Sequence, residues 1–536
     1  MKKQREKVSS RIDQRLSTLD ISPAALNELS SQTALLVAEY FERIAEMPVF
    51  PDTTAGETAL RLGKEIPLEG ERLGKLLNDC RVIFDRSRHN GHPRFFGYVA
   101  SPATAPGAYA DLIASTLNSN LTSWRSSPGP TELEKLVVRW LGSLVGYDEQ
   151  SQGLLTSGGS LANLSALLIA LRTKGTTDFG RTGLWNAQPV TIYASEEVHM
   201  SIPKAADILG IGREQVRLIE TDDRLRMNVK ALRRAIKKDQ KKGLRPICVA
   251  GSAGTVATGA IDPLEAIADT ASEFGLWFHV DGAYGALGAM DQRKRALFAG
   301  IERADSVSLD PHKWLYTPVD CGCLLLRDLA AAHSTFANSE ADYIKVHEQL
   351  GDESFAYWDY GIELSRRFRA LKIWLTLRYF GTRRIAEAIS HDNSMAEYLA
   401  RRLSSAADFE LLAPVVLSTT CFRYVPKALR EQLKIASPAG KRRLESELDQ
   451  LNTRVMHEVQ RGGHAYVSNA TVRGKFALRA CIINFRTTEA DIDQTLAVIR
   501  EVGRQLSGTG KDRPRINADK RGSEKKRRAS ETAHTR

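Results

Sequence analysis

The feature that most restricts the fold is a regular alternation of short apolar runs with helical segments between about residues 150 and 330. The predicted strands are Val190–Ala194, Ile247–Gly251, Leu276–Val280, Ser306–Leu309 and Gly322–Leu326. The predicted helices between them include Leu161–Arg172, Met227–Lys238 and Pro263–Phe274. Strands that alternate with helices form a mostly parallel sheet covered by helices on both faces. The chain is therefore predicted to be an α/β protein that binds its ligands at the carboxyl ends of the strands.

The remaining sequence predicts further parts, because 536 residues are too many for one simple core. We predict an N-terminal helical segment (1–104), a large domain (105–395), a small C-terminal α+β domain (396–507) and a basic, disordered tail (508–536). Strands near Phe422–Tyr424 and Phe476–Asn484 support the small domain, and a long helix is expected at Leu364–Tyr379. Another helix is expected to begin near Thr131, with Glu134 completing a capping box.

The net charge of +11 is concentrated at the C-terminus. Between Gly508 and Arg536 lie ten Lys/Arg and four acidic residues, a net charge of +6 in a stretch poor in large apolar side chains. We therefore expect no specific nucleic-acid partner for the folded part.

Location is predicted from three absences in the sequence. No apolar run approaches the ~18 residues that cross a bilayer, and the basic start leads into polar residues instead of an apolar signal segment. The six cysteines show no disulfide spacing. A cytoplasmic protein with reduced thiols and no membrane contact is expected.

A glycine-rich segment, Thr156-Ser-Gly-Gly-Ser-Leu-Ala-Asn163, opens one of the predicted helices. Glycines allow an anion to approach the backbone, and the free N–H groups of a helix start attract phosphate. Taken alone, such a turn is more often a simple helix cap.

Three other segments place chemically useful side chains at predicted strand ends. Asp281 closes a buried apolar strand, where a carboxylate needs a positive partner: a structural salt bridge or a protonated ring nitrogen. Lys313 follows an apolar strand, and a lysine removed from water can act as an amine nucleophile toward an aldehyde. His199 follows another strand, where a structural role is as common as a stacking or acid–base role.

Together and in this order, the four segments resemble the pyridoxal 5'-phosphate (PLP) dependent group II amino-acid decarboxylases, which include aromatic-L-amino-acid, histidine, glutamate and cysteine-sulfinate decarboxylases. The resemblance runs from about Pro93 to Thr487. The matching motifs are Pro93-Arg-Phe-Phe, Thr131-Glu-Leu-Glu, Asp310-Pro-His-Lys-Trp and Arg366-Arg-Phe-Arg-Ala-Leu-Lys372. It implies the PLP-dependent transferase-like fold type I and a homodimer whose active sites share residues across the interface.

The resemblance also implies a role for each matching residue, with no metal. The residues expected to hold PLP are Gly159, Ser160, His199, Asp281, Ala283, His312 and Lys313. Lys313 would carry the cofactor as a Schiff base, and Asp281 would pair with its ring nitrogen. A carboxylate about 4 Å from that protonated nitrogen stabilises it by about 4 kcal/mol at an effective dielectric constant near 20. His199 would stack on the ring, and Tyr343 would protonate the substrate carbon.

Two positions depart from the common pattern of the family. Val256 stands where a threonine is frequent, and Asp310 stands where several members have asparagine. A carboxylate near a phosphate is repulsive, so Asp310 is expected to be paired or turned away.

The substrate is the least determined feature. Alignment puts Asn90, Asn120 and Thr122 in the side-chain pocket with Tyr98 and Val99 nearby, a more polar set than a strictly aromatic substrate needs. We predict a role in amino-acid metabolism, the decarboxylation of an aromatic or broad range of L-amino acids. The alternatives are a glutamate, aspartate or cysteine-sulfinate decarboxylase, and a carbon–carbon lyase or aldehyde-forming enzyme on the same fold.

Overall fold

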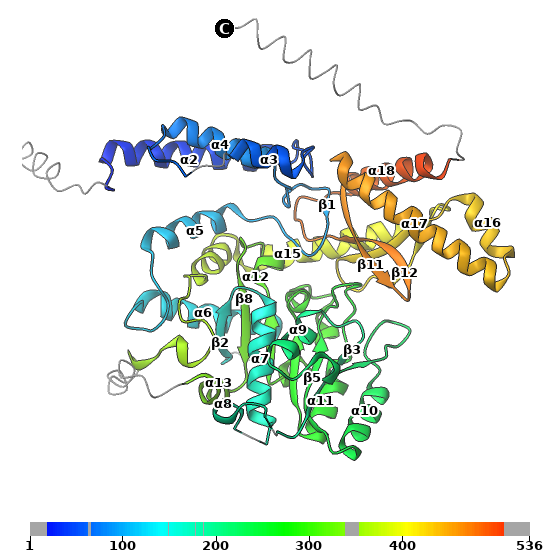
Figure 1. Ribbon diagram of the computed structural model, residues 1–536. Coiled ribbons are helices and arrows are strands. Elements are labelled where there is room, and N and C mark those ends of the chain that lie inside the picture. Colours follow the sequence, from blue (N-terminus) through cyan, green and yellow to red (C-terminus); the bar gives the residue numbers. More distant parts are fainter. Residues whose placement is uncertain are drawn as a thin grey trace, which may run out of the picture.

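The structure is a computed structural model that describes residues 19–62, 66–147, 150–176, 178–185, 187–337 and 353–508. Its N-terminal part contains the helices α2 (Pro23–Arg43), α3 (Ala55–Leu62) and α4 (Leu73–Asp85). Figure 1 shows these three helices together at one edge of the molecule, in blue. Ser22 caps α2 by accepting a hydrogen bond from the Ala25 N–H.

A seven-stranded sheet forms the centre of the large domain. Its strands are β2 (Gln152–Thr156), β3 (Val190–Ser195), β4 (Val216–Ile219), β5 (Arg245–Ser252), β6 (Trp277–Asp281), β7 (Ser306–Leu309) and β8 (Gly322–Leu326). Their order is β2-β8-β7-β6-β5-β3-β4. β8 is antiparallel to both of its neighbours, and the other pairs are parallel. The predicted mostly parallel α/β sheet is confirmed.

Helices cover both faces of this sheet, as Figure 1 shows. The helices of the large domain include α5 (Ala105–Leu117), α6 (Pro128–Val145), α7 (Gly159–Lys174), α8 (Phe179–Thr182), α9 (Ser201–Ile208), α10 (Val229–Lys241), α11 (Leu264–Phe274), α12 (Pro311–Trp314) and α13 (Leu329–Phe336). Neighbouring strand residues point to opposite faces. Val249 and Phe278 therefore join one buried core with α6, α10 and α11, whereas Ala250 and Trp277 join another with α7 and α9. Both faces of the sheet are buried, which explains the continuous apolar runs in the sequence.

The C-terminal part is built on a five-stranded sheet of order β1-β11-β12-β10-β9. Its strands are β1 (Phe95–Phe96), β9 (Phe409–Leu411), β10 (Thr419–Tyr424), β11 (Tyr466–Val472) and β12 (Lys475–Cys481). The accompanying helices are α15 (Ala370–Ser404), α16 (Lys427–Ile435), α17 (Pro438–Gly462) and α18 (Glu489–Ser507). The edge strand β1 comes from the predicted N-terminal segment and pairs in parallel with β11. The predicted boundary at 395/396 falls inside α15.

Several predicted element boundaries were wrong. α6 begins at Pro128, a residue suited to a first helical turn, so Thr131 lies inside the helix and its hydroxyl has no hydrogen-bond partner. Glu134 instead forms a buried ion pair with Arg366. α15 begins at Ala370, not at Leu364, and β12 ends at Cys481.

Other sequence expectations concern location and the tail. Within the described ranges, no helix is both long and apolar enough to cross a membrane. All six cysteines are free thiols, and all but Cys80 are buried. The predicted tail, from residue 509 onward, lies outside the described residues.

Candidate active site

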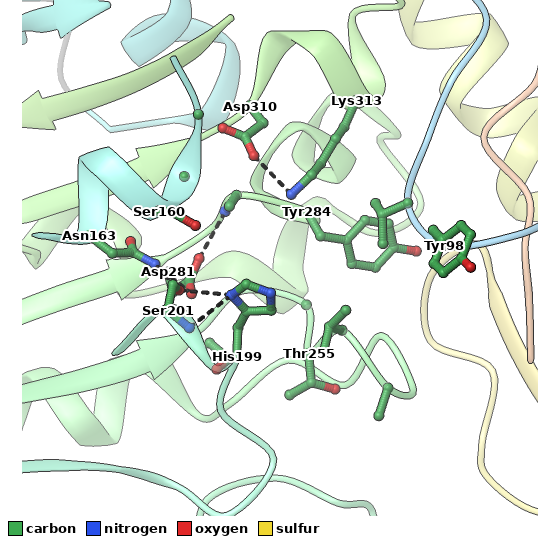
Figure 2. A pocket seen from close by; sticks show the side chains of 18 of the residues that line it. Tyr98, Ser160, Asn163, His199, Ser201, Thr255, Asp281, Tyr284, Asp310 and Lys313 are labelled. Atoms are coloured by element: carbon green, nitrogen blue, oxygen red, sulfur yellow. Dashed lines mark hydrogen bonds and ion pairs between the residues drawn. The ribbon is translucent and has the colours of Figure 1, made fainter. Parts of the chain in front are cut away.

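A cavity of about 680 Å³ opens at the carboxyl ends of the large sheet and reaches the small domain. Seven of the eight predicted site residues line it: Gly159, Ser160, His199, Asp281, Ala283, His312 and Lys313. Tyr343 lies outside the described residues, so its place is not tested. A cavity of this size holds a cofactor together with a small substrate. The side chains in Figure 2 come from several elements and point into the same space.

Lys313 lies in α12, directly after β7, and points into the cavity (Figure 2). Its Nζ lies 2.8 Å from Oδ2 of Asp310, and the two side chains are 19% and 3% exposed. The other Asp310 oxygen is buried and has no hydrogen-bond partner among the described residues. Asp310, which was expected to be paired or turned away, is therefore paired with the lysine. The carboxylate orients the amine and can hold its proton.

Asp281 ends β6 and is 7% exposed. Its Oδ1 accepts hydrogen bonds from the Ser308 hydroxyl (3.2 Å) and the Ala283 N–H (3.2 Å). Its Oδ2 accepts one from Nδ2 of Asn163 (3.0 Å). A carboxylate has about four acceptor positions, so one remains for a donor in the cavity. No basic side chain forms a salt bridge with Asp281 among the described residues, so its negative charge is available to a cationic group in the cavity, such as a protonated ring nitrogen.

His199 follows β3 and lies beside Asp281 in Figure 2. Its Nδ1 contacts the Ser201 hydroxyl at 2.8 Å and accepts the Ser201 N–H at 3.2 Å. Burial lowers the pKa of His199, and this effect exceeds the opposing attraction of Asp281. A neutral imidazole is a flat, weakly polar ring suited to stacking.

The start of α7 forms another wall of the cavity, beside Asp310. The first N–H groups of a helix have no partner within the helix, and Gly158 and Gly159 leave the backbone uncovered. A Cβ at Gly159 would lie 2.7 Å from Cβ of Ala283, so only glycine fits there. His312 is fixed nearby because its Nδ1 accepts the Cys321 N–H at 3.1 Å. This group of donors suits a phosphate.

Arg479 is a cavity residue that was not predicted. It lies in β12 of the small domain, is 3% exposed, and donates to the carbonyls of Tyr98 (2.7 Å) and Ala257 (3.1 Å). Its Nη2 is buried without a partner among the described residues. No acidic side chain forms a salt bridge with it among them. An arginine on a β-strand gives no sequence signal, since its place at the cavity depends on how the two domains pack.

The expected substrate pocket is only partly present in one chain. Tyr98 and Val99 line the cavity, whereas Asn90, Asn120 and Thr122 do not. Asn90 accepts a hydrogen bond from Arg88 (3.1 Å), and Asn120 accepts the Arg366 N–H (2.8 Å). The pocket composition inferred from alignment stays a prediction, with Tyr98 and Val99 at the cavity of one chain.

The fold and the cavity define a fold type I PLP enzyme, because an amine, a buried carboxylate, a flat imidazole and a phosphate cradle surround one space. The profile described as "Pyridoxal-dependent decarboxylase conserved domain" matches residues 57–425. The chain belongs to this family. It is accordingly a PLP-dependent carboxy-lyase, and PLP is its cofactor.

Similar proteins differ in their activities. An aromatic-L-amino-acid decarboxylase of Bacillus atrophaeus is 34% identical over 490 residues, covering 91% of this chain and 98% of the relative. A phenylacetaldehyde synthase of Petunia hybrida is 31% identical over 511 residues, covering 90% and 98%. The cysteine sulfinic acid decarboxylase of Mus musculus is 31% identical over 503 residues, covering 92% and 99%.

Solved structures show the same similarity along the whole fold. The crystal structure of mouse CSAD in apo form has a TM-score of 0.83 at 29% identity, covering 90% of this chain and 99% of that one. The crystal structure of Oryza sativa TDC with PLP and tryptamine has a TM-score of 0.83 at 26% identity, covering 92% and 100%. The predicted family and fold class are confirmed.

Proposed function

We propose that the protein decarboxylates an L-amino acid to its amine and CO2, with aromatic or broad side-chain specificity. The observation that carries this proposal is the cavity in which Lys313, Asp281 and His199 face the start of α7. Tyr98, Val99, Val256 and Tyr284 add aromatic and apolar surface to that cavity. Such surface favours a large apolar side chain over a small or charged one.

The proposed roles follow from what each side chain can do. PLP, when bound, supplies an electron sink for the electrons left by the departing CO2. Lys313 attaches the cofactor through its Nζ, and Asp281 keeps the ring nitrogen protonated by its negative charge. Asp310 holds the proton of the lysine amine at Oδ2. His199 and Ala283 confine the ring from either side, and a fixed substrate orientation selects which bond breaks.

A panel of substrates tests this proposal. Purified, PLP-loaded protein is assayed for CO2 and amine with the standard L-amino acids, 3,4-dihydroxyphenylalanine, 5-hydroxytryptophan and cysteine sulfinate. Release of amine from aromatic or several classes of amino acid is expected. Release of CO2 with aldehyde in place of amine, or no release from any substrate by protein that holds PLP, would contradict the proposal.

A second candidate, an acidic substrate, is favoured by Arg479. Arg479 lines the cavity, and its Nη2 is buried beside it without a partner among the described residues. A guanidinium suits a carboxylate, and the substrate offers one on Cα or on its side chain. Asp, Glu and cysteine sulfinate carry the second kind. The relatives include both an aromatic-L-amino-acid decarboxylase and a cysteine sulfinic acid decarboxylase, so both substrate classes occur among similar proteins.

Replacing Arg479 by Lys is expected to raise KM by at least about tenfold, because one charged hydrogen bond contributes about 1.5–3 kcal/mol. An equal rise for all substrates assigns Arg479 to the α-carboxylate. A rise confined to acidic substrates assigns it to the side chain. The absorbance of bound PLP serves as the control for folding, and an unchanged KM for every substrate would contradict a binding role.

Replacing Tyr343 by Phe is expected to retain PLP but to shift the product from amine toward aldehyde. The basis is the resemblance, which assigns its hydroxyl the proton that the substrate carbon receives; without that donor, the carbon stays open to oxygen. Aldehyde and amine are measured together by chromatography. Formation of amine alone at the wild-type rate would remove Tyr343 from this role.

We also propose that the protein is a homodimer. α5 carries the exposed apolar residues Leu112, Ile113 and Leu117, which are 56%, 54% and 57% exposed in one chain. Asn120 follows this helix and is also exposed, so it would lie at the edge of an interface that covers α5. Sedimentation is expected to give twice the 59.3 kDa of one chain. Substituting Glu at positions 112 and 113 should yield monomers; a wild-type monomer would contradict the proposal.

A further inference from the structure

We propose that Asn163 and Ser201 are positioning residues that hold His199 as the neutral tautomer with its proton on Nε2, directed into the cavity. This inference rests on the proposed function and adds to it the protonation state of one side chain in the site. It is argued from a chain of buried hydrogen bonds in which each donor and acceptor is determined by its neighbour. Figure 2 shows the part of this chain that joins Asn163, Asp281, Ser201 and His199.

Asp281 fixes the orientation of the Asn163 amide. The two groups lie 3.0 Å apart, and a carboxylate can only accept, so the amide nitrogen must face Asp281. The second hydrogen of the same nitrogen is then donated to the Ser201 hydroxyl at 2.9 Å. Asn163 and Ser201 are 1% and 3% exposed, so water does not compete for these bonds.

The amide oxygen of Asn163 faces His279 and gives an independent check of this orientation. Nε2 of His279 lies 3.0 Å from that oxygen and must donate to it. Complete burial lowers the pKa of His279 to about 4, so the ring is neutral and its Nδ1 is an acceptor. The Ser306 hydroxyl, 2.9 Å from Nδ1, can donate there because it already accepts the Trp277 indole N–H at 2.8 Å. Every hydrogen bond in this network therefore pairs one donor with one acceptor.

The other end of the chain sets the tautomer of His199. Because the Ser201 oxygen accepts from Asn163, its hydrogen is free to be donated to Nδ1 of His199 at 2.8 Å. The Ser201 backbone N–H also points to Nδ1, at 3.2 Å. Nδ1 therefore carries no proton. None of the described residues accepts from Nε2, which holds the proton of the neutral ring.

The charged groups around His199 do not remove this preference. Asp281 and Asp310 favour the doubly protonated ring, but burial, the largest effect, and Lys313 both oppose it, so the pKa of His199 is lowered. Both Ser201 donors stabilise the neutral ring alone, because a protonated Nδ1 cannot accept. His199 thus presents a hydrogen-bond donor, not a base, to whatever lies beside it in the cavity.

The test is a pH titration of His199 in the PLP-loaded protein labelled with ¹⁵N in its histidine rings. His199→Gln identifies the signal. We expect an unprotonated Nδ1 and a protonated Nε2 near neutral pH. Ser201→Ala removes one hydrogen bond to the neutral ring, so the midpoint of the His199 titration should rise by about 0.5 to 1 pH unit. Ser201→Thr, which keeps the hydroxyl, should retain the wild-type midpoint.

Ser195→Ala is the matched control, because it removes another buried hydroxyl whose oxygen, among the described residues, accepts the Glu197 N–H alone (3.1 Å). Its titration should match the wild type. A proton on Nδ1 in the wild type, or an unchanged midpoint in Ser201→Ala, would overturn the inference. The readout needs no turnover, so a failed substrate panel with the expected tautomer would count against the proposed function alone.

Discussion

Replacing Lys313 by Ala is expected to abolish CO2 release from every amino acid and to remove the absorbance band of lysine-bound cofactor. Nζ of Lys313 is the amine that the cavity holds in place, 2.8 Å from the Asp310 carboxylate. Loss of a covalent attachment point costs at least about a thousandfold in rate. Absorbance spectra and radiometric CO2 release measure the two effects on one sample.

Lys294→Ala provides the control for this variant. Lys294 is a poorly exposed lysine paired with Glu397 at 2.8 Å, and it does not line the cavity. Its replacement should leave both the spectrum and the rate within about twofold of the wild type, since a paired lysine outside the site contributes only to stability. Full activity in Lys313→Ala would remove Lys313 from the site altogether.

Replacing Asp281 by Asn is expected to lower kcat by about a hundred- to a thousandfold while PLP stays attached to Lys313. The amide keeps the shape of the carboxylate but lacks its charge, which contributes about 4 kcal/mol to a protonated nitrogen some 4 Å away at an effective dielectric constant near 20. The rate is measured under saturating substrate, with the absorbance of the bound cofactor as evidence of attachment.

Asp305→Asn is the matched control for Asp281. Asp305 directly precedes β7, at the amino end of that strand, and its carboxylate accepts the Phe278 N–H at 2.7 Å. The same loss of charge there should affect stability without a change in kcat. If Asp281→Asn also turns over at the wild-type rate, the carboxylate does not control the ring nitrogen.

The sequence was a good guide where a buried strand gave a continuous apolar run. Ser306–Leu309 and Gly322–Leu326 were predicted with the bounds that the structure has, and each is followed by a charged residue, Asp310 or Arg327. Asp281, Lys313 and His199 could be singled out because they follow strands whose carboxyl ends meet at one edge of the sheet. Ala283 and His312 were named only through the resemblance to the family. Their assigned roles stay predictions.

Other features could not be predicted, because they depend on packing between distant segments. Arg479 reaches the cavity only because the small domain lies against Tyr98 and Ala257. Asn163 was part of the glycine-rich motif, but its hydrogen bonds with Asp281 and His279 join residues more than 100 positions apart. The capping box at Thr131 failed because Pro128 begins the helix earlier.

The pairing of β1 with β11 has a consequence for how a ribosome produces this molecule. Tyr98, just after β1, donates from its N–H to the Ser468 hydroxyl, 370 positions later. At about 5 to 20 residues per second, the N-terminal strand emerges about 20 to 75 seconds before its partner exists. Phe95 and Phe96, which are each 1% exposed in the finished protein, spend that time unpaired. The nascent chain is thus most vulnerable to aggregation at its N-terminal end, where chaperones would have the longest opportunity to bind.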